Sequence, residues 1–286
     1  MKKVASLLLS VALIVTLLLP VSNTVFGESN GSAEVYDLKT EYADNPLGID
    51  VTKPRLSWKL QADERGQYQT AYHIQVASSE SELLEGNPDV WDTGKVESDQ
   101  SVNIVYEGEP LQSGKRYFWR VKVWDKHGIP SEWSEPAWWE MGLLDASDWQ
   151  GEWIGYDSGK EVNPAPLIRN EFTIEKPVQR ARVYVSGIGF YELSLNGEKV
   201  GDRVLDPGST NYEKRVLYTT YDVTDQLNQG DNAIGVELGR GRYGMTTPST
   251  WFWEQSPWHD DPKVLLQLEI EYDDGSTETI VSDESW

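Results

Sequence analysis

The chain has 286 residues and carries 25 lysines and arginines against 47 aspartates and glutamates, which gives a formal net charge of −22. Phosphate backbones repel so acidic a chain, and this excludes nucleic acid as a favoured partner. No cysteine is present, which excludes disulfides, thiol catalysis and a lipid-modified cysteine. The 13 tryptophans and 14 tyrosines outnumber the 5 phenylalanines, a bias that suits both half-buried core positions and stacking on sugar rings.

The first 27 residues have the layout of a secretory signal peptide. Two lysines precede a mainly apolar run over residues 4–19, and a short polar segment then leads to Gly27. The apolar run is shorter than the roughly 20 residues that span a bilayer comfortably, so we expect cleavage after Gly27 rather than a retained membrane anchor. Residues 28–34 then form a polar leader. The mature protein is therefore predicted to be secreted to the extracellular space, with no membrane as a partner after cleavage.

Residues 35–143 are predicted to form an immunoglobulin-like sandwich. Short alternating or apolar runs recur between turn residues, and no long amphipathic helix interrupts them. The strongest run, residues 117–125, places Tyr117, Trp119 and Val121 on one face. About seven such strands without a cysteine predict a sandwich that burial alone must stabilise.

Three spaced motifs follow one another in the second half of this domain: Tyr117-x-Trp119-x-Val121, Asp125-x-x-Gly128 and Ser131-x-Trp133-Ser134. Together they resemble the second half of a fibronectin type III domain. The resemblance implies that the tryptophans of this region are mostly core residues.

Residues 149–286 are predicted to form a second sandwich, of the jelly-roll type. Strand-like runs again alternate with turn residues, and Asn196-Gly197 and residues 273–276 have the composition of hairpin turns. The last strand-like run ends near Ser282 and the chain stops at Trp286, which we interpret as a truncation inside the domain. The expected fold class is therefore all-β, with an immunoglobulin or fibronectin III-like sandwich followed by an incomplete jelly-roll-like sandwich.

No motif in the sequence marks a catalytic centre. A Gly-x-Ser-x-Gly motif is absent, and the three histidines, His73, His127 and His259, are too scattered for a metal site or a catalytic triad. Carboxylate pairs for glycoside hydrolysis could be proposed anywhere among 47 acids, so their number carries no weight. We therefore assign no catalytic residue.

The segment over residues 239–261 is too long for a plain connection between strands, which favours a function for it. Aromatic rings and a guanidinium suit the recognition of sugars, and the glycines in the segment allow close approach of the backbone. The alternative is a loop that packs over the end of the sandwich or against another domain. The candidate carbohydrate-binding residues are Arg242, Tyr243, Trp251 and Trp253.

A further set of motifs spans nearly all of the mature chain. They are the segments 45–50 and 54–58 in the first domain and 183–197, 201–202, 205–212, 215–224 and 272–286 in the second. In this order they resemble the N-terminal region of bacterial α-L-rhamnosidases, whose first module is a fibronectin-like domain.

The resemblance implies a parent enzyme that hydrolyses terminal α-L-rhamnosides with inversion. The catalytic acids would lie in a downstream helical barrel, which would be a partner in the same chain, and the substrate would be a rhamnose-containing carbohydrate. In some members a domain like the second one binds rhamnose through calcium, which takes six to eight oxygen ligands. The candidate ligands here are Asn196, Asp202 and Asp206, although a hairpin turn also explains Asn196 and solvation explains the aspartates. No cofactor other than this calcium is expected.

Three functions follow from these observations. The leading hypothesis is the non-catalytic N-terminal part of a secreted α-L-rhamnosidase, with accessory carbohydrate binding. The alternatives are a stand-alone secreted carbohydrate-binding protein and a structural spacer that positions or shields a catalytic domain.

Overall fold

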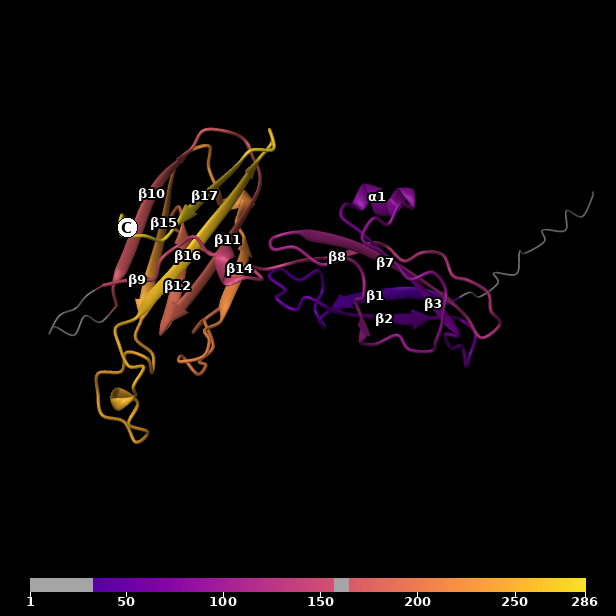
Figure 1. The fold of residues 1–286 in the computed structure, drawn as a ribbon, viewed down its shortest axis with the longest axis horizontal. Helices are drawn as coiled ribbons and strands as arrows, with labels where there is room; N and C mark the ends of the chain where they lie inside the picture. Colours follow the sequence, from indigo (N-terminus) through magenta and orange to yellow (C-terminus); the bar gives the residue numbers. More distant parts are fainter. Residues whose placement is uncertain (1–32, 157–164) are drawn as a thin grey trace, which may run out of the picture.

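The computed structural model describes residues 33–156 and 165–286, so the predicted signal peptide and most of the polar leader lie outside the described residues. The described chain forms two β-domains that lie next to each other and meet near β8 and β14 (Figure 1). Within the described ranges no helix is long and apolar enough to cross a membrane.

The regular elements of the first domain are β1 (Glu34–Thr40), β2 (Arg55–Gln61), β3 (Ala71–Ala77), α1 (Glu80–Glu85), β4 (Trp91–Asp92), β5 (Val96–Glu97), β6 (Ile104–Val105), β7 (Arg116–Trp124) and β8 (Ala137–Glu140). One sheet has the order β1-β2-β6 and the other the order β4-β3-β7-β8, with β5 also paired to β3. All of these pairings are antiparallel. The arrangement is a two-layer sandwich, as predicted.

The core of the first domain follows from the alternation of side chains along its strands. On β7 the predicted inward residues, Tyr117, Trp119 and Val121, are all buried, and so is Val123, because alternate side chains of a strand point to the same face. Tryptophans from two other strands join them, so burial stabilises this domain without any disulfide. The three fully buried tryptophans are Trp58, Trp119 and Trp139.

The regular elements of the second domain are β9 (Ile154–Gly155), β10 (Leu167–Ile174), β11 (Val178–Ile188), β12 (Phe190–Leu195), β13 (Glu198–Lys199), β14 (Tyr218–Asp222), η2 (Thr224–Gln226), β15 (Gly230–Gly239), η3 (Trp253–Gln255), β16 (Lys263–Tyr272) and β17 (Thr277–Val281). One sheet has the order β10-β15-β12-β13. The other has the order β14-β11-β16-β17, with β9 also paired to β16. The inner faces of both sheets contribute to one apolar core.

Hairpin turns lie where the composition predicted them. Asn196 and Gly197 both have a positive φ, 53° and 85°, and connect β12 to β13. Gly275 has a φ of 78° in the turn between β16 and β17. Glycine and asparagine favour these turns because they tolerate the left-handed region that a two-residue hairpin turn requires.

The two domains meet at a group of charges, which we call the Glu140 cluster: the buried Glu140 and Arg182 and the partly exposed Arg116 and Arg180. Glu140 ends β8 and is 0% exposed. Its carboxylate accepts hydrogen bonds from Arg182 on β11 (Nε to Oε1 2.5 Å, Nη2 to Oε2 3.2 Å) and from Arg116 on β7 (Nε to Oε2 3.1 Å). Arg180 Nη1 lies 3.5 Å from Oε2. A buried carboxylate requires such partners, so the cluster makes the contact between the domains specific.

The linker that follows β8 is fixed to both domains. Ser113 Oγ of the first domain donates to Asp148 Oδ2 (2.6 Å), and Gln267 Nε2 of the second donates to Asp148 O (3.1 Å). The Ser113 hydroxyl is the main reason that the pKa of Asp148 lies below its usual value. A Cβ at Gly142 would lie 2.0 Å from Tyr218 Oη, so only glycine allows the two domains to approach so closely here.

Candidate functional site

The predicted aromatic segment is the connection between β15 and β16, which we call the aromatic loop (residues 240–262). It extends from one end of the second domain (Figure 1). At its base the rings of Tyr243 and Trp258 are stacked, with centroids 6.0 Å apart and planes 12° apart. Tyr212 meets both rings edge-on at 5.2 Å. Since Tyr212 belongs to the connection between β13 and β14, these contacts hold two loops together at the same end of the sandwich.

Arg242 is oriented by the same two loops. Its guanidinium lies 5.4 Å from the ring centroid of Trp253 and 5.7 Å from that of Tyr212, and Nη2 donates to Thr210 O (3.1 Å). Nε is buried and has no hydrogen-bond partner among the described residues. Cation–π contacts with two rings therefore orient the guanidinium group. Only one of its five N–H donors forms the hydrogen bond described here, to Thr210 O.

Two neighbouring aromatic residues form the exposed face of the loop. Trp251 is 73% exposed and Phe252 is 62% exposed. Phe252 has a left-handed backbone conformation (φ 56°) and precedes η3, so the direction of the chain changes between these two rings and Trp253. Flat apolar faces that remain in water are suited to stacking on a ligand or a partner.

The four predicted carbohydrate contacts thus lie in different environments. Arg242 and Trp253 are brought together, Tyr243 is buried at the base of the loop, and Trp251 lies on the exposed face. The candidates predicted from the sequence did not include Phe252, although it stands between Trp251 and Trp253. They also did not include Tyr212 as a part of this site, because no local signal connects it to a loop so much later in the chain.

Polar contacts stabilise the two ends of the aromatic loop, next to β15 and β16. Arg240 Nη1 lies 2.7 Å from Asp261 Oδ1, and His259 Nε2 lies 2.7 Å from Met245 O. Lys263 pairs with Asp260 and holds the pKa of this carboxyl below its usual value. His259 therefore has a structural contact in the loop.

The three predicted calcium ligands are not brought together. Asp206 lies beside the start of β12, where its Oδ2 accepts the hydroxyls of Tyr191 (2.6 Å) and Thr219 (2.8 Å). Asn196 follows the far end of β12, roughly 16 Å along the strand, and its side-chain oxygen accepts an amide of β15 at 2.9 Å. Asp202 is exposed. No group of three or more acidic or histidine side chains that could hold a metal occurs in the described part of the chain. The three residues do not fit one shared site in this arrangement, and calcium binding stays a prediction.

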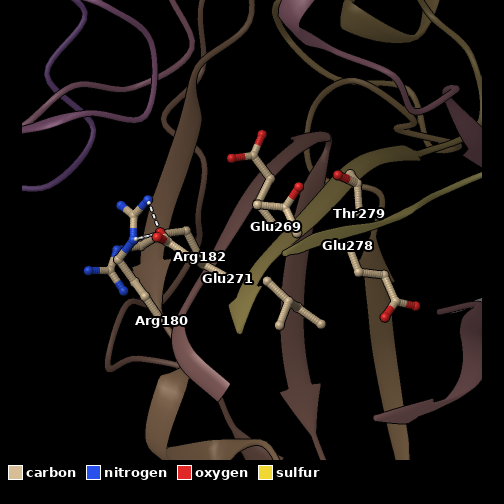
Figure 2. A pocket seen from close by; sticks show the side chains of 8 residues that line it. Arg180, Arg182, Glu269, Glu271, Glu278 and Thr279 are labelled. Atoms are coloured by element: carbon tan, nitrogen blue, oxygen red, sulfur yellow. Dashed lines mark hydrogen bonds and ion pairs between the residues drawn. The ribbon is translucent and has the colours of Figure 1, made fainter. Parts of the chain in front are cut away.

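A polar pocket of about 250 Å³ lies on β11, β16 and β17, beside the Glu140 cluster (Figure 2). Arg180 donates to Glu271 Oε2 from Nε (3.2 Å) and from Nη2 (3.1 Å), and Gln267 Nε2 donates to Glu269 Oε1 (2.8 Å). Each of these carboxylates therefore already accepts a hydrogen bond from a neighbouring side chain. These contacts do not mark any of the carboxylates as a general acid or base, and we assign no catalytic role to this pocket.

Two family models match the chain, in sequence order. The Rha78A-like, N-terminal immunoglobulin domain matches residues 35–145, and the alpha-L-rhamnosidase N-terminal domain matches residues 176–286. Among curated proteins, an alpha-L-rhamnosidase of Formosa agariphila is 42% identical over 270 residues, which cover 85% of this chain and 28% of the relative. One of an Alteromonas species is 37% identical over 252 residues, which cover 85% of this chain and 27% of the relative.

Solved structures give the same result. The α-L-rhamnosidase of Dictyoglumus thermophilum matches with a TM-score of 0.81 and 44% identity, over 88% of this chain and 29% of that one. The native enzyme of Aspergillus terreus matches with a TM-score of 0.77 and 33% identity, over 89% of this chain and 29% of that one. The chain thus spans less than a third of the length of these relatives.

Proposed function

Residues 35–145 belong to the family of Rha78A-like N-terminal immunoglobulin domains and residues 176–286 to that of α-L-rhamnosidase N-terminal domains, and we propose that this chain is the non-catalytic N-terminal part of a secreted α-L-rhamnosidase. The observation that carries the proposal is the match to both domains in the order in which the relatives contain them. The all-β fold and the resemblance expected from the motifs are both confirmed. The first family is described as immunoglobulin, so the fibronectin type III assignment stays a prediction.

In this proposal the hydrolysis of terminal α-L-rhamnosides, with inversion, belongs to a helical-barrel domain of the same protein. The two β-domains would then present or position the substrate. A positioning role is supported by the Glu140 cluster, which joins the two domains through buried charges.

The purified chain is expected to release no product from an aryl α-L-rhamnoside, because no catalytic acid can be assigned in it. The measurement is a spectrophotometric assay of the liberated aryl alcohol, with a full-length α-L-rhamnosidase as the positive control. Turnover by the purified chain would place catalytic residues within these two domains and contradict the proposal. Coding sequence for a helical barrel beyond Trp286 would support it independently.

Accessory carbohydrate binding is assigned to the exposed face of the aromatic loop. Trp251 and Phe252 offer apolar ring faces, and Arg242 offers guanidinium donors beside Trp253. Sugars combine an apolar face with hydroxyl groups, so rings and donors in one loop suit them. The relative from Streptomyces avermitilis has been solved in complex with L-rhamnose, and rhamnose is therefore the probe that we choose.

Replacing Trp251 with alanine is expected to weaken L-rhamnose binding by roughly two- to tenfold, the value of one aromatic stacking contact. Titration calorimetry or chemical-shift changes, with and without calcium, measure the effect. Tyr68→Ala is the matched control, since Tyr68 is an exposed aromatic residue of the first domain. Equal affinity of the Trp251 variant and the unmodified chain would remove the aromatic loop from the proposal, and a need for calcium would support the predicted metal.

A further inference from the structure

β10 forms an open edge of the second domain. It is the first strand in the order β10-β15-β12-β13 and pairs only with β15 among the described strands. In Figure 1 it lies on the side of the second domain that faces away from the first domain. With 8 residues it is long for an edge, and such edges are templates for pairing with another strand.

The hydrogen-bond pattern shows which backbone groups of β10 face away from β15. Leu238 N donates to Pro166 O, so in this ladder even-numbered residues of β10 face β15. The amides and carbonyls of the odd-numbered residues point to the open edge. The side chains of these same residues are exposed on the outer face of the sheet: Leu167, Arg169, Glu171 and Thr173.

We propose that β10 pairs antiparallel with β10 of a second copy, about a two-fold axis that passes beside Asn170. In this register Arg169 lies opposite Glu171 of the second copy, and Leu167 lies opposite Thr173. Odd-numbered residues meet odd-numbered residues, so each amide and carbonyl that faces away from β15 finds a partner in the second copy. The two four-stranded sheets become one continuous sheet.

Charge complementarity selects this register. Arg169 and Glu171 already pair along β10, with both side chains about two-thirds exposed (65% and 67%). Across the two-fold axis each arginine also meets a glutamate of the other copy, which gives four alternating charges. Opposite charges directly across antiparallel strands stabilise the pair, and like charges destabilise it. A shift of the register by two residues loses this match.

The inward-facing side chains of β10 are also compatible with the proposed pairing of two copies. Ile168 and Phe172 are only partly buried and pack against the core of the second domain from its open side. About the proposed axis, Ile168 of one copy lies opposite Phe172 of the other. An aromatic residue opposite a β-branched one is a favourable cross-strand pair, so the dimer covers apolar surface that the monomer leaves at its edge.

The test is the association state of the full chain and of charge variants, measured by sedimentation velocity over a range of micromolar concentrations. The unmodified chain is expected to dimerise. Glu171→Arg places like charges across the axis and is expected to raise the Kd of the dimer by roughly tenfold or more. The double variant Arg169→Glu with Glu171→Arg restores opposite charges in the same register and is expected to dimerise again.

Glu192→Arg is the matched control. It makes the same charge change on β12 of the same sheet, where Glu192 pairs with Lys199, and is expected to leave the dimer unchanged. Circular dichroism verifies that each variant is folded. A monomeric unmodified chain overturns the proposal, as does a dimer that Glu171→Arg leaves intact or that the double variant fails to restore. The test does not depend on the proposed rhamnosidase function.

Discussion

Replacement of Glu140 by alanine is expected to lower the free energy of unfolding by about 3–5 kcal/mol, the usual cost of removing one partner from a buried ion pair. Glu140 is fully buried, and Arg182 is nearly so, with 4% of its side chain exposed. The variant removes the buried carboxylate that pairs with both Arg182 and Arg116, and Arg182 keeps only Asp222, at 2.8 Å. Urea unfolding followed by tryptophan fluorescence measures the loss, since Trp139 precedes Glu140 in the chain.

Two controls separate the buried charge from a general effect of losing a carboxylate. Glu192→Ala removes an exposed glutamate whose side chain is 52% exposed, and its pair with Lys199 is expected to contribute at most about 1 kcal/mol. Glu140→Gln keeps the size and one acceptor, and is expected to lose less stability than Glu140→Ala. If Glu140→Ala costs no more than Glu192→Ala, the Glu140 cluster does not join the domains energetically.

Trp139→Ala is expected to destabilise the first domain by about 3–5 kcal/mol through the cavity that it leaves. Trp139 is fully buried. Its ring is stacked near Tyr117 at 5.6 Å, and Tyr106 meets it edge-on at 5.9 Å. The same unfolding experiment applies, and the change is expected to appear as a lower midpoint concentration of urea.

The matched control for Trp139 is Trp251→Ala. Trp251 is 73% exposed, so its removal is expected to change the unfolding free energy by about 0.5 kcal/mol or less. Trp139→Phe is expected to cost less than Trp139→Ala, because it leaves a smaller cavity and Trp139 Nε1 has no hydrogen-bond partner among the described residues. Similar losses for Trp139→Ala and Trp251→Ala would contradict the division of tryptophans between core and surface.

The sequence predicted the sandwiches because period-two alternation and turn residues are local signals. Tyr117, Trp119 and Val121 could be placed in the core from one run of residues, and Asn196-Gly197 could be placed in a hairpin. The Glu140 cluster could not be predicted, because its members come from β7, β8 and β11. Only the folded arrangement brings a glutamate of the first domain to the arginines of the second.

In the aromatic loop, too, the contacts between distant segments could not be predicted from the sequence. Its length and composition identified the segment, but composition does not distinguish a ring that supports the loop from a ring that faces water. Tyr243 is buried because Tyr212 and Trp258 pack on it, and Tyr212 arrives from another loop. Trp251, in the same loop, is 73% exposed. The burial of Tyr243 thus depends on a contact between distant segments of the chain.

The alternation of β8 has a consequence for engineering by domain exchange. Two neighbouring residues of this strand have different roles. Trp139 packs in the core of the first domain, and Glu140 forms an ion pair with Arg182 of the second domain. An excised second domain would lack Glu140, so Arg180 would keep only Glu271 and Arg182 only Asp222 as a carboxylate partner. We therefore expect that either domain can be fused to an unrelated domain only together with the end of β8, which carries Glu140, and with the linker residue Gly142. The transplantable module is the pair of domains.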